Sequence, residues 1–296
     1  NRAGVMTDKD KPPGRAPAGE RVPFALRLMR LLFARAGHLF PRLMGRWAYH
    51  LWFRTRRYPD RAAGRRALQT AVRETLPVDG LPVAVYCWGN GPVVLFVHGW
   101  SGRGTHVAAF IRPLQQAGYR VIAVDAPGHG ETPGKRTNIL ECARVLQAVV
   151  QQYGPVHGVI THSFGGMVLA YAMAQGLQAG RVVCIAAPAR VEFLVERFAS
   201  LMAMPDAVVA NLKARLEQRF DVNIWEMLAT DANAARLEAP ALVIHDENDG
   251  SVPWRQGRLI ADAWPGAQFL RTQGLGHTRI LRDPAVIERV SEFIRA

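Results

Sequence analysis

Ser163 lies in a short segment whose residues could supply a nucleophile. Residues 155–160 form an apolar run typical of a buried strand, and residues 167–178 have the pattern of a helix. A serine on so sharp a strand-to-helix turn exposes its hydroxyl, and its neighbours two positions away must be small for the backbones to pass. Those neighbours are Thr161 and Gly165. Taken alone, the segment fits a tight structural connection as well as a nucleophile.

A serine needs a base within hydrogen-bond reach, and chain order narrows the choice. When a nucleophilic serine stands on a strand-to-helix turn of a mostly parallel sheet, an acid and then a histidine follow it along the chain. Of the nine histidines, only His277 comes after the acidic cluster at residues 246–249. It lies in a glycine-rich loop, Gly-Leu-Gly-His, beyond the last apolar strand-like run. We therefore interpret His277 as the general base rather than as a solvated loop side chain.

Two carboxylates compete for the role of the acid. Asp246 and Asp249 both follow the apolar run at residues 242–245, in a turn that could also be merely solvated. An orienting carboxylate should stand a few residues beyond its strand, where the loop can turn it toward the histidine. This reasoning favours Asp249 by spacing and leaves Asp246 as the alternative.

An oxyanion needs two backbone amides, and two strand ends offer them. The N–H of Phe164 lies at a helix start, where backbone donors lack partners. Trp100 follows the apolar run at residues 93–97, in a loop whose glycines let the backbone turn an N–H inward. We predict that the amides of Trp100 and Phe164 form an oxyanion hole and that the Trp100 indole lines the acyl pocket.

The elements that must position these residues alternate between strands and helices from about residue 81 onward. Strands are predicted at 83–87, 93–97, 120–124, 155–160, 182–186, 242–245 and 268–270, with helices at 106–116, 138–152 and 284–294. Such alternation predicts an α/β domain with a mostly parallel sheet and helices on both faces. Ligands bind beyond the carboxyl ends of the strands in such sheets, and every residue singled out above lies at such an end.

The alternation stops within residues 190–238, where apolar residues recur at helical spacing. We expect a small helical cap there, inserted after a strand end so that it covers the site, although ordinary packing helices fit the same spacing. Together with Trp100, the candidates for the substrate pocket are Phe193, Phe198, Leu201 and Trp225.

The N-terminal part has a different composition. Residues 1–76 contain 17 Lys and Arg against 5 Asp and Glu, whereas residues 77–296 contain 20 against 19, so the net charge of +13 belongs almost entirely to the first part. Residues 1–22 have the composition of a flexible tail, and residues 23–76 form a basic amphipathic helical arm that precedes the domain at 77–296. Its apolar stripe favours packing on the domain, with peripheral membrane contact through residues 24–57 as the second interpretation and nucleic-acid binding as the least favoured.

The remaining features point to a cytoplasmic protein. The three cysteines are an odd number without metal-like spacing, which argues against a disulfide framework. The apolar stretch after residue 22 is interrupted by Arg27, Arg30 and Arg35, so no secretory signal is recognised. No nucleic-acid partner is expected, and the sequence does not specify the oligomeric state.

Five motifs together resemble the α/β-hydrolase superfamily, in particular its bacterial serine esterase-like members with a small helical cap. They are HGWSG at 98–102, DAPGHG at 125–130, THSFGG at 161–166, DGSVP at 249–253 and GLGH at 274–277. The resemblance covers residues 81–296 and implies Ser163 as nucleophile, His277 as base and Asp249 as acid. Two departures are Thr161, in place of the elbow glycine, and Asp246, where the superfamily often has glycine.

The expected function is hydrolysis of a carboxylic ester, or a related acyl compound with an apolar part, through an acyl-enzyme intermediate. No metal or organic cofactor is implied by this chemistry. The alternative is an inactive hydrolase-fold binding protein that its basic arm recruits to a membrane or to an acidic partner. An intact nucleophile, base and acid argue against the alternative.

Overall fold

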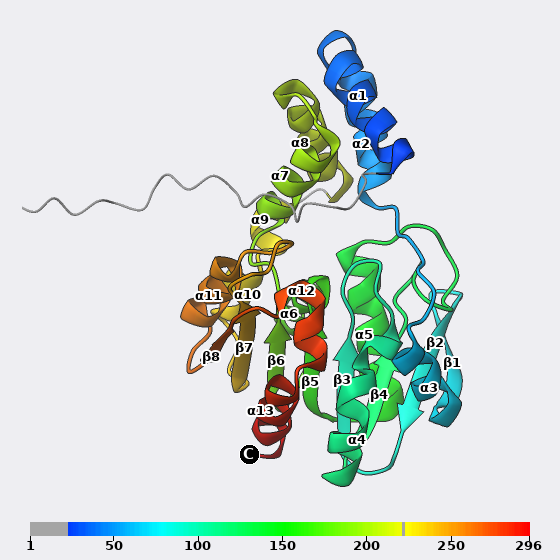
Figure 1. Ribbon diagram of the computed structural model, residues 1–296, viewed down its shortest axis with the longest axis vertical. Coiled ribbons are helices and arrows are strands. Elements are labelled where there is room, and N and C mark those ends of the chain that lie inside the picture. Colours follow the sequence, from blue (N-terminus) through cyan, green and yellow to red (C-terminus); the bar gives the residue numbers. More distant parts are fainter. Residues whose placement is uncertain (1–22, 221–222) are drawn as a thin grey trace, which may run out of the picture.

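A computed structural model describes residues 23–220 and 223–296, and its centre is an eight-stranded sheet (Figure 1). The expected flexible tail at residues 1–22 lies outside the described residues. The strand order is β1-β2-β4-β3-β5-β6-β7-β8. The strands are β1 Val72–Val78, β2 Leu81–Trp88, β3 Val93–Val97, β4 Arg120–Val124, β5 Val156–His162, β6 Val182–Ile185, β7 Ala241–Asp246 and β8 Gln268–Thr272.

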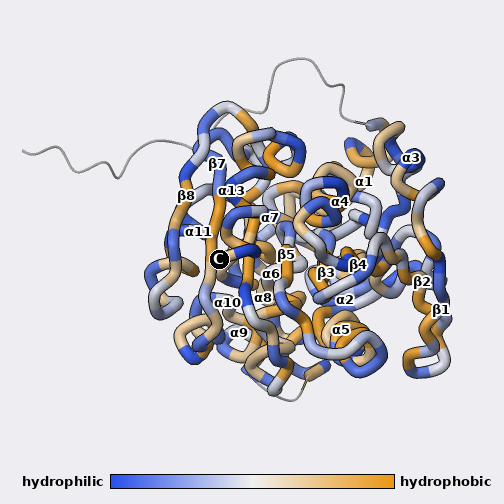
Figure 2. The backbone as a smooth tube through the Cα atoms, turned by 90° about the horizontal axis from the view of Figure 1, so that it is seen from below, coloured by the Kyte–Doolittle hydropathy of each residue, from blue (hydrophilic) through white to orange (hydrophobic). Residues whose placement is uncertain are grey.

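The sheet is parallel from β4 to β8 and antiparallel only at β1 and β2. All five residues of β3 are buried, and the central strands are among the most hydrophobic stretches of the chain (Figure 2). A strand covered on both faces needs such a continuous apolar run. The predicted mostly parallel sheet is therefore confirmed. Its strand order reverses around β3, so the carboxyl ends of β3 and β5 meet at one point of the rim.

Helices cover both faces of this sheet. On one face lie α5 (Ile139–Tyr153), α6 (Phe164–Ala174), α10 (Thr230–Ala234) and α11 (Trp254–Ala263), which share one apolar core. On the other face lie α3 (Ala62–Thr70), α4 (Ala108–Gln116) and α13 (Pro284–Arg295), which share a second. Short helical turns complete the loops: η1 (Gly104–Val107), α12 (Gly276–Arg279) and η2 (Ile280–Arg282).

A separate helical lobe extends beyond the carboxyl ends of the strands (Figure 1). Two of its helices, α1 (Phe24–Leu39) and α2 (Pro41–Trp52), come from the N-terminal arm. The others, α7 (Val191–Met202), α8 (Asp206–Phe220) and α9 (Ile224–Met227), follow β6 within the region predicted as a cap. The apolar stripe of α1 and α2 packs against α7 and α8, with Phe33 and Ala48 fully buried.

Glycine permits the close approach of arm and cap. A Cβ added at Gly45 of α2 would lie 2.5 Å from the Cβ of Asn211 on α8. Two aromatic pairs also join the arm to the cap, Trp52 with Phe198 at 5.4 Å between ring centroids and Phe53 with Phe220 at 6.4 Å. The arm and the cap therefore form one packed unit.

Three elements differ from the sequence-based expectation. The sheet begins at Val72, so the boundary predicted at residue 77 falls inside β1. Half of β1 is exposed because it is an edge strand, and its apolar pattern is correspondingly weak. Helices α3 and α11 were not predicted. Arginines interrupt both sequences, and only a narrow face of each helix is buried, at Gly64 and Ala67 in α3 and at Gly257, Ile260 and Ala261 in α11.

Candidate active site

Ser163 stands on the turn between β5 and α6 in a conformation that few residues adopt. Its φ is 52° and its ψ is −124°, a region that favours glycine. The turn is held because the Ser163 N–H donates to the carbonyl of Ile185 at 2.8 Å. At Gly165 a Cβ would lie 2.4 Å from the carbonyl oxygen of Val97, so only glycine fits there. The turn therefore holds the Ser163 side chain at the carboxyl end of β5.

Thr161 occupies the other position that should be small. Its hydroxyl donates to the carbonyl of Val183 on β6 at 3.1 Å, and its side chain is fully buried. Because the hydroxyl points across to the neighbouring strand, the departure from glycine is accommodated without disturbing the turn.

The structure brings Ser163, His277 and Asp249 into one hydrogen-bonded row. His277 Nδ1 lies 2.7 Å from Asp249 Oδ2, and its Nε2 lies 3.1 Å from Ser163 Oγ. An ionised carboxylate only accepts, so the proton resides on Nδ1 and Nε2 is left to accept from the serine hydroxyl. The three residues come from the ends of β5, β7 and β8, more than a hundred residues apart for Ser163 and His277. This is the arrangement that activates a serine hydroxyl.

The Asp249 side chain is fully buried and accepts several hydrogen bonds. Its Oδ1 accepts from the amides of Ser251 and Val252 at 2.8 and 2.9 Å. Burial alone would raise the pKa of Asp249, but hydrogen bonding from His245 and His277 and the amide of Val252 hold that pKa well below its usual range. Asp249 is therefore ionised at neutral pH, as the protonated Nδ1 of His277 requires.

Asp246, the alternative acid, has a different set of partners. Its carboxylate accepts from the amides of Leu275 and Gly276 at 3.0 and 2.9 Å, and from the Thr272 hydroxyl at 2.8 Å. Burial would raise the pKa of Asp246, yet these donors keep the pKa below its usual value. Asp246 thus fixes the loop that carries His277, whereas the imidazole itself bonds to Asp249.

Trp100 and Phe164, whose amides were predicted to form an oxyanion hole, directly follow the carboxyl ends of β3 and β5. Among the described residues, no atom accepts a hydrogen bond from either N–H, so both remain available to a ligand. The two rings pack edge to face with centroids 5.0 Å apart, and the Trp100 ring also meets His129 at 5.7 Å. Gly99 brings this loop against the elbow, since a Cβ there would lie 3.0 Å from the Ser163 Cβ.

Two buried histidines hold the loops that follow β3 and β4. His98 Nε2 accepts from the amide of Ala126 at 3.0 Å, and His129 Nε2 accepts from the amide of Ser101 at 2.9 Å. Desolvation by burial, assisted by the neighbouring His129, lowers the pKa of His98 well below its usual value. Both rings act as neutral acceptors and join the HGWSG loop to the DAPGHG loop.

His162 is a neighbour of the site that the sequence reasoning did not single out. Its Nε2–H donates to the backbone carbonyl of His277 at 2.8 Å, and the two rings lie 4.8 Å apart. Desolvation by burial, together with the neighbouring His277 imidazole, lowers the pKa of His162 to about 3. Nothing in the motif spacing distinguishes this histidine, because its importance arises from a fold contact with a loop 115 residues away.

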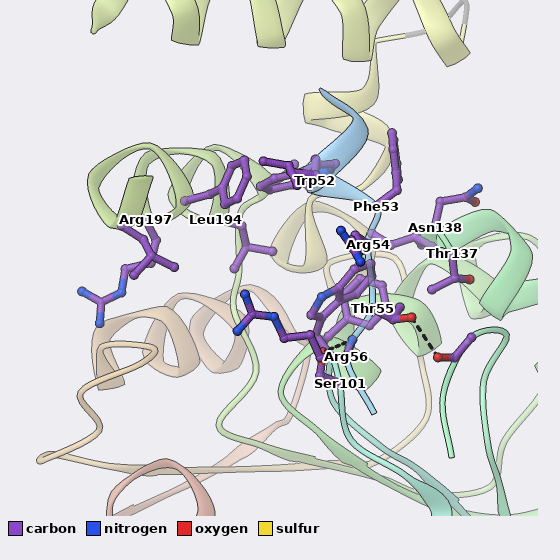
Figure 3. A pocket seen from close by; sticks show the side chains of 18 of the residues that line it. Trp52, Phe53, Arg54, Thr55, Arg56, Ser101, Thr137, Asn138, Leu194 and Arg197 are labelled. Carbon is purple, nitrogen blue, oxygen red and sulfur yellow. Dashed lines mark hydrogen bonds between the residues drawn. The ribbon is translucent and has the colours of Figure 1, made fainter. Parts of the chain in front are cut away.

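A cavity of about 980 Å³ lies above Ser163, between the sheet rim and the helical lobe (Figure 3). Its floor is formed by Trp100, Ser101, Ser163 and Phe164, and its walls come from α1, α2, α7, α8 and α9. The apolar lining of the walls comprises Leu26, Met29, Leu51, Trp52, Phe53, Ile139, Pro188, Val191, Leu194, Phe198, Leu201, Met202, Leu216, Phe220, Ile224 and Leu228. A ligand with a long apolar part fits such walls.

Three of the five predicted pocket residues line this cavity, namely Trp100, Phe198 and Leu201. Phe193 and Trp225 do not, and the prediction for them was wrong. Phe193 precedes Leu194 on α7, which rotates it about 100° away from the lining face. The Trp225 indole instead donates to Glu217 at 2.6 Å and packs under Lys213.

The sequence reasoning missed the contribution of the arm to the cavity. Residues 51–58, which include the end of α2 and the segment after it, line the cavity together with Leu26 and Met29 of α1. The arm was assigned to packing, membrane contact or nucleic acid, and no motif marks it as part of a site. Its role follows from its docking on the cap.

Among residues 23–220 and 223–296, no group of three or more His, Cys, Asp or Glu side chains is arranged to hold a metal ion. The three cysteines are buried and unpaired. None of the described helices combines the length and the hydropathy needed to cross a bilayer.

Known proteins share this fold and parts of the sequence. The chain is 24% identical over 229 residues to lysophosphatidylserine lipase ABHD12 of Danio rerio, a match that covers 69% of this chain and 58% of that relative. The structure of an esterase from Exiguobacterium antarcticum superposes with a TM-score of 0.60 at 16% identity, covering 76% of this chain and all of that one. The structure of a membrane phospholipase A, described as a bacterial virulence factor, has a TM-score of 0.60 at 19% identity and covers 92% of this chain and 97% of that one.

The structural matches establish the fold, and the sequence match spans less than two thirds of the curated relative. The family is established separately. Residues 94–290, more than half of the chain, match the model of the alpha/beta hydrolase family. The resemblance inferred from the five motifs is thus confirmed, and the protein belongs to the alpha/beta hydrolase family.

Proposed function

We propose that this hydrolase cleaves carboxylic esters with a long apolar acyl chain, with Ser163 as nucleophile, His277 as general base and Asp249 as the acid that orients it. The main support is the continuous row of hydrogen bonds from Ser163 Oγ through His277 to Asp249, at 3.1 and 2.7 Å. The apolar cavity directly above Ser163 supports an apolar acyl chain.

In the first half-reaction, Ser163 Oγ attacks the ester carbonyl and His277 Nε2 takes the hydroxyl proton. A bond forms between Oγ and the acyl carbon, and the carbonyl oxygen becomes an oxyanion that the amides of Trp100 and Phe164 stabilise. The intermediate then expels the alkoxide as the ester C–O bond breaks, and the alkoxide receives the proton from His277. The acyl group remains on Ser163.

In the second half-reaction, a water molecule gives its proton to His277 and its oxygen attacks the acyl carbon. The bond to Oγ breaks, Ser163 recovers its proton from His277, and the carboxylic acid leaves. Asp249 holds the Nδ1 proton throughout and stabilises the imidazolium that forms in each half-reaction.

The test is covalent labelling with a fluorophosphonate, followed by hydrolysis of p-nitrophenyl butyrate. We expect labelling of the unmodified protein and none of Ser163→Ala, and a fall in kcat of about 10⁶-fold in Ser163→Ala and in His277→Ala. Both variants should retain the circular dichroism spectrum of the parent. Absence of labelling in folded protein would refute the proposal and favour a binding protein that has lost turnover.

A further inference from the structure

One part of the cavity lining carries positive charge without compensation. Five basic side chains line it, Arg54, Arg56, Arg57, Lys135 and Arg197, and its described lining contains no Asp or Glu. The rest of the lining is mostly apolar, with a few uncharged polar residues such as Thr137 and Asn138. A cavity with an apolar part and a cationic part is complementary to an amphiphile with a negatively charged group.

The backbone of residues 54–56 is fixed directly above the floor of the cavity. The Arg56 amide donates to Ser101 Oγ at 3.1 Å, next to Trp100 (Figure 3). The Thr55 hydroxyl donates to the carbonyl of Gly128 at 2.8 Å, and the Thr55 amide donates to the backbone carbonyl of Lys135 at 3.0 Å. Arg54 and Arg56 are therefore held at the strand-end loops that surround Ser163.

The basic side chains differ in how they are engaged. The Arg57 guanidinium donates to the carbonyls of Thr132 and Gly134, and Arg197 donates to the carbonyl of Gly250 at 2.5 Å. For Arg54 and Arg56, in contrast, the described residues supply neither a carboxylate within 4.0 Å nor a hydrogen-bond acceptor for the guanidinium. Guanidinium groups bind phosphate and carboxylate by paired hydrogen bonds. Those of Arg54 and Arg56 are available to bind such a group.

We propose that the substrate is an anionic amphiphile, an acyl ester whose phosphate or carboxylate group binds Arg54 and Arg56 while its acyl chain lies among α1, α7 and α8. This proposal rests on the proposed function and names the substrate class of the same site. The apolar walls alone would accept a neutral ester equally well. The two arginines select the charged one.

The test compares dodecanoate esters whose alcohol part is either neutral or anionic, at concentrations below micelle formation. They are monododecanoylglycerol, its phosphate ester, and O-dodecanoyl lactate, of which the last two separate phosphate from carboxylate recognition. We expect kcat/KM for at least one anionic ester to exceed that of the neutral ester by about tenfold or more. In the variant Arg54→Gln/Arg56→Gln this ratio should fall to about one, whereas Arg46→Gln, an exposed arginine of α2 outside the cavity lining, should retain it.

A binding measurement separates this proposal from the proposed catalysis. Dodecyl phosphate is titrated into the Ser163→Ala variant, with tryptophan fluorescence as the signal. We expect the dissociation constant to rise about tenfold when Arg54 and Arg56 are replaced by glutamine and to remain unchanged with Arg46→Gln. Two results would overturn the proposal even if ester hydrolysis is observed. One is an equal dissociation constant in Ser163→Ala with and without the arginine replacements, and the other is an anionic-to-neutral ratio of kcat/KM near one in the unmodified protein.

A second surface lies on the outer side of the arm. Of the eleven exposed large apolar side chains in the described residues, seven belong to residues 24–43. They are Phe24, Leu28, Leu31, Leu32, Leu39, Phe40 and Leu43. The same helices carry five arginines and no acidic residue, and they form the end of the molecule farthest from α4 and α13 (Figure 1). Exposed apolar residues between arginines are typical of a helix that lies in a membrane interface.

We infer that this face of α1 and α2 binds a lipid bilayer that contains anionic lipids. Positive charge on the helices complements anionic headgroups, and the apolar side chains reach the acyl region. Leu26 and Met29 of the same helix line the cavity, so a bilayer bound here lies next to the cavity walls. Binding of a bilayer at this surface does not depend on which ester the site hydrolyses.

The test is co-sedimentation with vesicles of phosphatidylcholine, alone or mixed with phosphatidylglycerol. We expect binding to the mixed vesicles that salt weakens, and a loss of about tenfold in the partition coefficient of Leu31→Asp. Leu259→Asp is the matched control, since Leu31 and Leu259 are helical leucines with exposed fractions of 54% and 45%. Equal partitioning of the two variants, or a dimer in light scattering without vesicle binding, would overturn the inference.

Discussion

The sheet rim around Ser163 and the helical lobe above it are built from opposite kinds of contact. At the rim, buried polar side chains make directional bonds, such as those of Asp249 with His277, Ser251 and Val252. In the lobe, apolar rings and small residues pack together, as in the stack of Phe33 on Trp47 with centroids 4.8 Å apart. The structure of the rim depends on which atoms donate and which accept hydrogen bonds, whereas that of the lobe depends on the volume and hydrophobicity of its side chains.

This difference separates the chemistry from the choice of substrate. A directional network tolerates few residue types, because an unmatched buried donor or acceptor costs about 1–3 kcal/mol. Apolar packing tolerates many substitutions of similar volume. A chain with this fold can therefore keep the hydrogen-bonded row of Ser163, His277 and Asp249 while substitutions in the helical lobe change the size, shape and charge of the cavity.

The strongest test of the rim compares its two carboxylates. In Asp249→Asn the amide group would donate to His277 Nδ1, which would move the proton to Nε2 and prevent it from accepting the serine proton. We expect kcat to fall about 10⁴-fold with little loss of stability, as measured by p-nitrophenyl ester hydrolysis and urea unfolding. The amides of Ser251 and Val252 can still bond to the remaining oxygen.

Asp246→Asn provides the contrasting result. All the described donors to Asp246 are amides or a hydroxyl, so an Asn side chain would place an N–H against at least one of them. We expect a loss of about 2–4 kcal/mol in the free energy of unfolding. If both variants lost activity without loss of stability, the separation of an orienting acid from a loop anchor would be wrong.

The lobe is tested most directly at Gly45. In Gly45→Leu the new side chain would meet Asn211, because even its Cβ would lie 2.5 Å from the Cβ of that residue. We expect α2 to shift from α8 at a cost of about 1–3 kcal/mol, and hydrolysis of dodecanoate esters to fall about tenfold. Acetate esters, which do not reach the lobe, should change less than about twofold. Equal losses for both chain lengths would show that the lobe does not select the acyl chain.

The same division explains what the sequence could predict about the site. Ser163, His277 and Asp249 stand at strand ends whose motifs are local in sequence, so their order and spacing predicted the three side chains that hydrogen bonds join in the structure. The role of Asp246 was not predicted, since its partners Thr272, Leu275 and Gly276 belong to another strand end. His162 was missed for the same reason, because its partner is the backbone of His277.

The lobe was predicted less well because apolar periodicity identifies a buried face without identifying its partner. Leu26 and Met29 belong to the apolar stripe of the arm, but the pattern could not reveal that these two residues line the cavity above Ser163. Phe193 and Trp225 were assigned to the pocket by composition, and a rotation of one residue along the helix removed Phe193 from it. The sequence assigned Arg54 and Arg56 only to the basic arm, whereas in the structure the Arg56 amide donates to Ser101 Oγ.

Low pH should lower the free energy of unfolding through a buried histidine at the rim. His162 is buried and neutral, with its pKa lowered from 6.5 to about 3. Below about pH 6.5 the unfolded chain binds a proton at this residue and the native protein does not, so stability is lost as the pH falls toward 3. We expect the pH slope of the unfolding free energy to be smaller by about 1.4 kcal/mol per pH unit in His162→Asn between about pH 6 and 4.

The control for this prediction lies within the same experiment. Above about pH 7 His162 is neutral in both states, so the two stability curves should run parallel there. Guanidinium or urea unfolding across the pH range measures both regions. Parallel curves at low pH as well would show that His162 takes up a proton in the native state and that its burial is not maintained.

The smallest expected effect concerns backbone strain, which both regions contain. Ser163 at the rim and Ala203 in the cap have φ values of 52° and 54°, but their ψ values are −124° and 47°. The second pair of angles is the left-handed helical region that alanine tolerates at a modest cost, whereas the first is close to glycine-only.

Relative to Ser163→Ala, Ser163→Gly should therefore be more stable by about 1 kcal/mol, or about 2–4 °C in Tm. Ala203→Gly should change Tm little, because relief of a small strain is offset by the greater flexibility of the unfolded chain. An equal gain at both positions would mean that the elbow holds no more strain than an ordinary helix end, and that the rim fixes its serine through hydrogen bonds alone.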